Sequence, residues 1–377
     1  MTSPDFPAVV VVSAFFPRHG GGIERVAGHL SERLARAGFP LHWFAGGSAD
    51  EAPVVPVPGL RVTRAASIDL LERTIGLPAP LWSLSSLRQL YQAIGKARVV
   101  HIHDCLYLSS VAAFTFAKVR GKKILITQHI GTIPFRSGLL RFLHGFANRT
   151  VSRGMLKSAD AVAFVSPTVH AYFSGFVKFR NHHDVIFNGV DHETFHPAAP
   201  EHPRSKTLKM LFVGRFVEKK GIHLLRGCMD LPGTDWTFVG KGPQSPASWD
   251  VPMDNVTLRS DLTPEQLADL YRAADLMVLP SVGEGFPLVV QEALACGLPV
   301  LVSSEVAGSF ADPSLDGVFI HDEHHLDQAR ELRALLASIT AAPDRLRALR
   351  SAAQGLAGRW SWQACTAHYA RIIRSMA

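Results

Sequence analysis

Apolar and polar positions along the chain follow the pattern of buried strands that alternate with amphipathic helices. Continuous apolar runs such as 8–14 and 208–213 are typical of parallel strands that are covered on both faces of a sheet. A glycine-containing loop follows each run, and apolar residues then recur at helical spacing, most clearly from Ile23 onward. The pattern predicts strand–turn–helix units in both halves of the chain.

The repeating pattern breaks near the middle of the chain. Three prolines within seven residues, from Pro197 to Pro203, mark a linker. We therefore expect two doubly wound α/β domains, 1–196 and 205–359, that face each other across a cleft. The length of 377 residues agrees with two domains at about 100–200 residues each.

Candidate chemistry concentrates in the stretch 279–302. Glu284 lies in a glycine-rich turn directly after an apolar strand, and Phe286-Pro287 opens the following helix. Such a turn presents backbone N–H groups and a helix N-terminus at the carboxyl edge of a parallel sheet, where phosphate binds well. Glu292 follows about two helical turns later and could reach the hydroxyls of a sugar. From the spacing alone, an ordinary unit with two solvated glutamates is an equally good interpretation.

Two cations occupy a second turn of this kind. Gly214-Arg215 and Lys220-Gly221 bracket the loop that follows the apolar run 208–213. A guanidinium can bind two phosphate oxygens at once, and an ammonium group is a compact cation. Fixed positive groups beside a leaving diphosphate provide the electrostatic stabilisation that a transfer reaction requires.

The first half carries polar residues where its predicted strands end. His103 ends one strand and His129 follows another, so the two side chains could share one crevice at the sheet edge. The glycines 20–22 follow the first strand and would let the backbone approach a ligand closely.

Several elements resemble, in order, those of the retaining glycosyltransferases of family 4, which have the GT-B fold. They are the segments N-G-V-D at 188–191, G-R-x4-K-G at 214–221, G-K-G-P at 240–243 and E-x7-E at 284–292. The resemblance implies transfer of a sugar from a nucleotide diphosphate, with retention of its anomeric configuration. It also implies that the N-terminal domain binds the acceptor, that the C-terminal domain binds the donor, and that a last helix at about 360–377 packs back on the N-terminal domain.

The resemblance also implies the site residues. Catalytic roles fall to Glu284, His129, Arg215 and Lys220. Donor contacts fall to Gly21, Gly22, Gly214, Arg215, Lys220, Gly242, Glu284, Gly285, Phe286, Pro287, Leu288 and Glu292. His103 and Arg136 are candidates on the acceptor side. The front-face displacement of this family has no clear protein nucleophile, so we assign no general base.

The resemblance implies no metal and no other cofactor, since the chain contains no D-x-D triplet and the family does not usually require a metal. The donor is expected to be a UDP- or GDP-linked sugar. One departure leaves the distal donor loop open: the family usually has a G-G turn and an acidic residue where this chain has V-A-G-S-F-A-D at 306–312.

Charge and apolar composition bear on partners and location. The net charge of +7 suits phosphate-bearing ligands, an anionic membrane or nucleic acid, but the basic residues are scattered and aromatic stacking motifs are missing, so no nucleic acid is expected. Four unpaired cysteines, an N-terminus without a basic leader, and the lack of an 18-residue apolar stretch favour a cytoplasmic protein. The segment 135–157 contains basic residues interleaved with apolar ones. It either makes a peripheral contact with the cytoplasmic membrane face or forms an ordinary surface helix.

We therefore expect an enzyme that extends a glycan or lipid-linked glycan in cell-surface polysaccharide biosynthesis. The alternatives are a glycosyltransferase for a soluble small-molecule natural product and an inactive nucleotide-sugar-binding protein. The complete set of Arg215, Lys220, Glu284 and Glu292 argues against the inactive protein.

Overall fold

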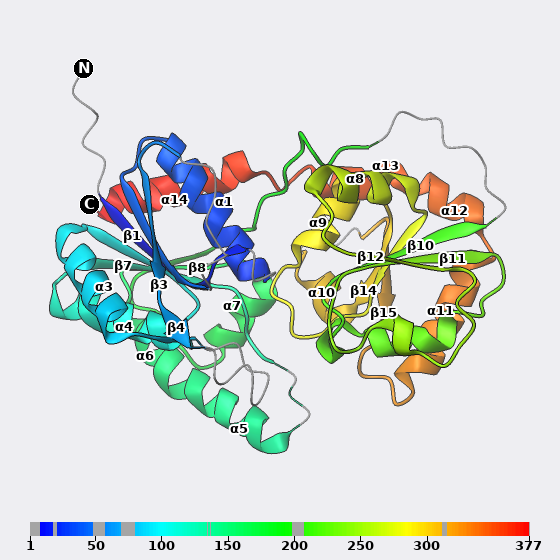
Figure 1. Ribbon diagram of the computed structural model, residues 1–377, viewed down its shortest axis with the longest axis horizontal. Coiled ribbons are helices and arrows are strands. Elements are labelled where there is room, and N and C mark those ends of the chain that lie inside the picture. The colour runs from blue at the N-terminus through cyan, green and yellow to red at the C-terminus, as the bar shows by residue number, and fades with distance from the viewer. Residues whose placement is uncertain are drawn as a thin grey trace. The chain divides into compact units, whose positions relative to one another are not determined.

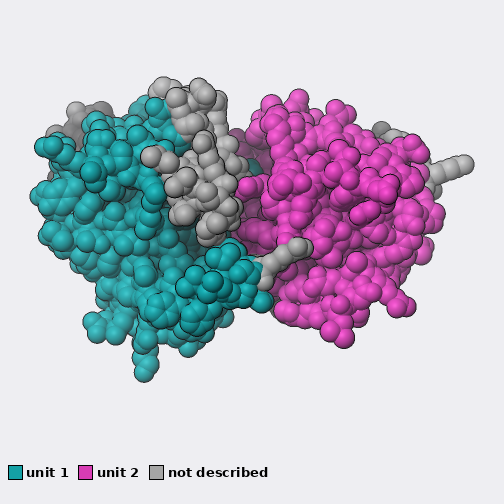
Figure 2. Space-filling model, turned by 60° about the horizontal axis from the view of Figure 1, so that its bottom comes forward, with its two compact units in different colours: residues 1–187, 363–377 teal, residues 188–362 magenta. Residues whose placement is uncertain are grey.

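The computed structural model divides the chain into two compact units (Figures 1 and 2). Unit 1 comprises residues 1–187 and 363–377, and unit 2 comprises residues 188–362. The structure describes residues 8–17, 21–47, 57–68, 80–133, 135, 137–197, 207–310 and 315–376. The confirmed fold class is α/β with two Rossmann-like units.

Unit 1 is built on a seven-stranded parallel sheet in the order β3-β2-β1-β6-β7-β8-β9. Its strands are β1 (Val9–Phe15), β2 (Leu41–Gly46), β3 (Leu60–Ala65), β6 (Val99–His103), β7 (Lys123–Gln128), β8 (Ala161–Phe164) and β9 (His182–Val185). Strands β4 (Ser67–Ile68) and β5 (Leu81–Trp82) form a separate antiparallel pair. Its helices are α1 (Gly22–Arg36), α3 (Leu84–Lys96), α4 (Leu108–Val119), α5 (Gly138–Ala147), the π-helix η2 (Asn148–Ser152), α6 (Arg153–Ser158), α7 (Pro167–Ser174) and α14 (Trp362–Met376).

Unit 2 contains a six-stranded parallel sheet in the order β12-β11-β10-β13-β14-β15, which is the doubly wound order of dinucleotide-binding folds. Its strands are β10 (Leu208–Val213), β11 (Thr234–Val239), β12 (Val256–Arg259), β13 (Leu276–Leu279), β14 (Val300–Ser303) and β15 (Val318–His321). Its helices are η3 (Glu218–Lys220), η4 (Ile222–Cys228), η5 (Pro246–Ser248), α8 (Pro264–Ala273), α9 (Leu288–Ala295), α10 (Ser304–Gly308), α11 (Gln328–Thr340), α12 (Pro343–Ala348) and α13 (Arg350–Ala357).

The central strands of both sheets are buried along their whole length, as their continuous apolar runs predicted. The start of α8 also follows the sequence, because Thr263 and Gln266 form the reciprocal capping box and Pro264 occupies the first turn. No helix in the described part of the chain is long and apolar enough to cross a membrane.

Some predicted boundaries were wrong. A helix does begin at Ile222, as the sequence indicates, but it is the short 3₁₀ helix η4, which contains Gly227, a poor helix former. The apolar spacing over 77–94 predicts a helix, but α3 begins only at Leu84, where the Ser83 hydroxyl accepts the N–H of Ser86; residues 77–79 lie outside the described part. Pro287 is the N-cap of α9 and not its first helical residue.

Candidate active site

Glu284 lies in the turn between β13 and α9, where two lysines from the loop after β10 meet it. The ammonium of Lys220 lies 2.8 Å from Oε1 of Glu284, and that of Lys219 lies 3.8 Å from the same atom. The Glu284 side chain is only 12% exposed. Burial alone would raise the pKa of Glu284, but the charges of Lys220 and Lys219 outweigh burial and hold the pKa below its usual value. The carboxylate is therefore ionised and paired in the absence of a ligand.

Lys219 was not predicted from the sequence, although it lies next to Lys220. The attraction of Glu284 raises the pKa of Lys219, but burial and the neighbouring charges of Lys220 and Arg215 outweigh it, so the pKa lies below its usual value. Two lysines thus meet Glu284, and Arg215 lies close enough to Lys219 to lower its pKa. Such a cluster has the excess positive charge that an incoming diphosphate would neutralise.

Gly221 turns the chain so that the Lys220 side chain can reach Glu284. Its φ is +68°, and a Cβ at this position would lie 2.2 Å from the carbonyl oxygen of Pro280. Both the left-handed backbone and the close approach of the strand end exclude a larger residue. The conformation explains why the G-R-x4-K-G segment ends in glycine.

A second carboxylate holds the turn that carries Glu284. An oxygen of Glu305, at the start of α10, accepts the backbone N–H of Gly283 at 2.9 Å. Burial raises the pKa of Glu305, although the Gly283 bond opposes the shift. The sequence did not predict this role, since Glu305 lies at the start of the segment that departs from the family pattern.

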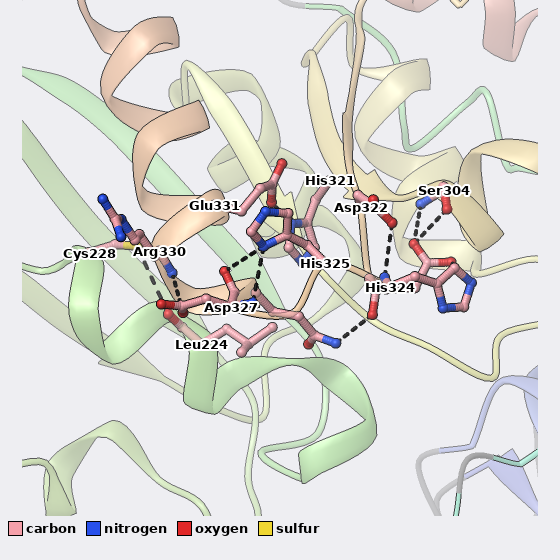
Figure 3. Close-up of polar contacts among 12 residues, drawn as sticks. Leu224, Cys228, Ser304, His321, Asp322, His324, His325, Asp327, Arg330 and Glu331 are labelled. Carbon is pink, nitrogen blue, oxygen red and sulfur yellow. Dashed lines mark hydrogen bonds and ion pairs between the residues drawn. The ribbon is translucent and has the colours of Figure 1, made fainter.

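Glu323 in turn caps α10. Its carboxylate accepts the N–H and the hydroxyl of Ser304 at 2.8 and 2.7 Å, and Figure 3 shows these two bonds at Ser304. It also accepts the N–H of Glu305 at 3.0 Å. A carboxylate at the first backbone N–H groups of a helix is a favourable cap. The chain of contacts therefore runs from Glu323 through α10 and Glu305 to the turn beside Glu284.

Glu292 is buried in the middle of α9, with 4% of its surface exposed. The hydroxyl of Tyr271, on α8, donates to its Oε2 at 3.2 Å. Tyr271 was not predicted to belong to the site. Its contact fixes the carboxylate that the sequence places two turns beyond Glu284.

The remaining predicted donor residues of unit 2 fall into two groups. Phe286 is a core residue, because its ring packs against Phe310 and Trp360, and Gly285, Pro287 and Leu288 are buried beside it at the start of α9. Gly214 and the exposed Arg215 lie directly after β10. Gly242 is required by packing, since a Cβ there would lie 2.4 Å from the carbonyl oxygen of Phe216.

In unit 1, the structure brings together the two histidines that the sequence placed at one sheet edge. Nδ1 of His103, at the end of β6, lies 3.0 Å from Nε2 of His129, directly after β7. The backbone N–H of His129 also donates to Asp104 at 3.0 Å, and Asp104 adopts a left-handed φ of +61°. Burial lowers the pKa of His103 to about 3, and burial and the charge of His103 lower that of His129. Both imidazoles are therefore neutral at physiological pH.

Gly21 and Gly22, the other predicted residues of unit 1 that the structure describes, lie at the start of α1. A Cβ on Gly22 would meet no atom within 4 Å, whereas a Cβ on Gly21, the N-cap, would lie 1.9 Å from Oε2 of the buried Glu24, so a carboxylate already lies at this helix N-terminus. Arg136 lies outside the described residues. The loop after His129 is held by Asn148 of η2, whose amide donates to the carbonyl of Gly131 at 3.1 Å. A π-helix thus anchors this loop.

Comparisons with known proteins agree with this arrangement. Residues 20–194 match the family model described as Glycosyltransferase Family 4, and residues 207–338 match that of Glycosyl transferases group 1. The chain is 36% identical to the D-inositol 3-phosphate glycosyltransferase of Segniliparus rotundus, over 91% of this chain and 82% of that protein. It belongs to glycosyltransferase family 4. The Mycobacterium tuberculosis glycogen synthase is another relative, 27% identical over 99% of this chain and 93% of that protein.

Solved structures share the fold of this family 4 glycosyltransferase. A sucrose-phosphate synthase from Thermosynechococcus elongatus has a TM-score of 0.75 at 22% identity and covers 98% of this chain and 99% of its own. Anabaena HepE in complex with UDP-glucose has a TM-score of 0.70 at 15% identity and covers 98% of this chain and 100% of its own. The predicted GT-B fold and the assignment to retaining glycosyltransferases are thus confirmed.

Proposed function

We propose that this enzyme transfers a sugar from a nucleotide diphosphate to an acceptor that is presented at an anionic membrane surface, such as a lipid-linked glycan. The observation that supports the donor is the pairing of Lys219 and Lys220 with Glu284, together with the charge of Arg215 near Lys219. A relative in fold, HepE, has been solved with UDP-glucose, which favours a UDP-linked sugar over the GDP-linked alternative. No metal or other cofactor takes part in the proposed reaction.

In the proposed mechanism, Arg215 and Lys220 hold the diphosphate and stabilise the charge that builds up as the sugar leaves. The N-terminus of α9 adds backbone donors to the phosphate site of unit 2. Glu284, released in part from Lys220 by the phosphate, accepts hydrogen bonds from the hydroxyls of the sugar. Glu292, oriented by Tyr271, binds the ribose.

The neutral histidine pair suits a hydroxyl-bearing ligand. A neutral imidazole can both donate and accept a hydrogen bond, whereas a protonated one can only donate. We propose that His129 contacts the transferred sugar and that His103, bonded to it, fixes the tautomer of its ring. His103 is then a positioning residue for His129 on the acceptor-binding unit.

The donor can be tested by thermal unfolding with a panel of UDP-, GDP-, ADP- and TDP-sugars. A selective rise in the melting temperature is expected with one nucleotide, because a ligand that binds only the folded state stabilises it. Arg215→Ala should abolish the rise, and Arg226→Ala, which removes an exposed arginine from η4 of the same unit, should not. Equal loss in both variants, or no rise with any nucleotide, would contradict the proposed donor site.

The membrane part of the proposal rests on α5. None of its residues is buried, and four large apolar side chains are exposed at the helical spacing i, i+3, i+4 and i+7: Leu139 (66%), Phe142 (67%), Leu143 (48%) and Phe146 (59%). Arg141 lies on the same helix, and Arg149, Arg153 and Lys157 follow it on η2 and α6. An apolar stripe beside cationic side chains is the composition of helices that lie in the interface of anionic membranes.

Flotation with lipid vesicles tests this contact. The enzyme should float with vesicles that contain about one third phosphatidylglycerol and remain behind with pure phosphatidylcholine, since the apolar stripe and the cations act together. Leu139→Ser should reduce flotation. Leu84→Ser, which removes an 85% exposed leucine at the start of α3, is the matched control and should leave flotation unchanged.

A soluble acceptor is the second candidate, because the relative from Segniliparus rotundus is named for D-inositol 3-phosphate. If the enzyme fails to bind vesicles but consumes a UDP-sugar in the presence of D-inositol 3-phosphate, this candidate replaces the lipid-linked acceptor. If neither acceptor leads to release of the nucleotide, both acceptors are refuted. The donor proposal, which thermal unfolding tests, would remain intact.

A further inference from the structure

Unit 1 carries a cluster of metal-ligating side chains at the edge of its sheet. His182, Asp184 and His368 each direct one ligand atom into a space where these atoms lie within 4.8 Å of one another. His182 and Asp184 belong to the edge strand β9, and His368 belongs to the C-terminal helix α14. Residues two apart on a strand project to the same face, so β9 offers both side chains to α14.

The cluster is held by contacts that do not depend on a metal. Oδ2 of Asp184 lies 3.0 Å from Nε2 of His368, while Oδ1 of Asp184 accepts the backbone N–H of Val185 at 2.8 Å. The carboxylate is therefore oriented by its own strand and points one oxygen at the helix. Asp184 and His368 are partly exposed, at 41% and 27% of their side chains, so an ion can enter from solvent.

We propose that His182, Asp184 and His368 bind a zinc ion, or a divalent transition metal of similar preference, and that the ion fastens α14 to β9. Two imidazoles and one carboxylate with a water in the fourth position are a common ligand set of tetrahedral zinc. Bond lengths of about 2.0–2.2 Å place zinc ligands about 3.3 Å apart, so the three side chains need only small rotations to close on the ion. This site in unit 1 differs from a metal site on the donor diphosphate, for which the chain lacks the D-x-D triplet.

Unit 2 contains another segment rich in histidine and acidic residues, H-D-E-H-H-L-D at 321–327. Comparison with this segment shows what distinguishes the proposed site. Its side chains cap backbone groups: Asp322 accepts the N–H of His324, His325 accepts that of Asp327, and Asp327 accepts that of Arg330 (Figure 3). Among the described residues, only the cluster on β9 and α14 brings three such ligand atoms together. The segment that is richest in histidine is therefore not the proposed site. The proposed site is identified by three ligand atoms that lie together in space but come from distant parts of the sequence.

The ion would have a structural effect, because α14 is separated from the rest of unit 1 by all of unit 2 in the sequence. A metal ion bound by both β9 and α14 would link two segments of the folded unit that lie far apart in the sequence. Zinc should therefore stabilise the attachment of α14 and protect it from proteolysis, without any role in sugar transfer.

The test uses the full-length protein, freed of metal with a chelator, in a buffer at pH 7.5. Titration with zinc chloride, followed by calorimetry, should show one equivalent bound per chain and a melting temperature that rises with zinc concentration. His182→Ala and His368→Ala should each weaken binding by at least about tenfold. His183→Ala is the matched control, because it removes the neighbouring imidazole on β9, which projects to the opposite face and stacks on Phe179.

Two results would overturn the proposal. The first is an absence of zinc binding at 100-fold molar excess over the protein. The second is zinc binding that His182→Ala and His368→Ala leave unchanged, which would place the ion elsewhere. Cobalt(II) supplies an independent readout, since a tetrahedral site gives strong visible absorption; its loss in both variants, with unchanged circular dichroism, would confirm ligation and exclude misfolding.

Discussion

The ion pair between Lys220 and Glu284 permits a quantitative test of the site. Nζ and Oε1 are 2.8 Å apart, and the two side chains are 15% and 12% exposed. At this distance two unit charges attract each other by about 1.5 kcal/mol in bulk water and by about 6 kcal/mol at an effective dielectric constant of 20. Because Lys219 remains 3.8 Å from Glu284 and shares the attraction, we expect a coupling energy of about 2–3 kcal/mol.

A double-mutant cycle measures this coupling. Lys220→Met and Glu284→Gln remove the charges but keep the shapes, and the free energy of unfolding of the four proteins is obtained from urea denaturation. The values can be compared where the m value is unchanged. The coupling is the part of the double-mutant effect that the two single mutants do not account for.

The pair of Lys241 and Asp261 is the matched control, because it lies in the same unit at 2.6 Å but is 68% and 71% exposed. Its cycle should give no resolvable coupling, since solvent screens exposed charges. A Lys220–Glu284 coupling as small as that of the control would refute the argument that burial strengthens the pair and sets the pKa of Glu284.

Three further predictions concern stability. Burial lowers the pKa of His103 from 6.5 to about 3, so between these pH values the unfolded chain binds a proton here that the folded chain does not; His103 alone should make the stability fall by about 1.4 kcal/mol per pH unit as the pH drops from 6.5 toward 3. Because the pKa of His129 is lowered as well, His103→Asn should reduce the slope measured in urea titrations by about this amount and not remove it. Gly233→Ala should cost about 1–2 kcal/mol through its φ of +69° alone, whereas Gly221→Ala adds the clash with a carbonyl and should cost more than that; equal melting temperatures for the two would exclude the clash. Glu323→Ala should cost about 1–2 kcal/mol through loss of the cap on α10, measured by denaturation, and an unchanged value would show that solvent replaces the cap.

Most of the fold could be predicted because the signal is local. Each buried strand is a continuous apolar run, and glycines end the helices, so both Rossmann-like units are visible in the sequence. The contact of His103 with His129 was also predictable, since adjacent parallel strands end at one edge. The 3₁₀ helix at Ile222 was not predictable from periodicity, because an apolar spacing of three or four residues fits either type of helix.

The site was only partly predictable because its contacts depend on side-chain direction across long sequence separations. Lys220 and Glu284 were both expected near a phosphate, but nothing in the sequence shows that they pair with each other in the absence of a ligand. The adjacent pair of lysines was a usable signal for Lys219. Glu305 had no such signal, since its bond to Gly283 comes from a short helix, α10, in the stretch where the chain departs from the family pattern.

The route of the chain has a consequence for synthesis of the protein. Tyr369 on α14 is 2% exposed and bonds Thr127 of β7 at 3.0 Å, so residues from the very end of the chain complete the interior of unit 1. A ribosome releases the whole of unit 2 before it releases α14. Unit 2 can therefore finish folding before α14 is available, while unit 1 can be completed only after α14 has been synthesised. A nascent chain that stalls before α14 would leave unit 1 incomplete, although every residue of unit 2 up to α14 is already present.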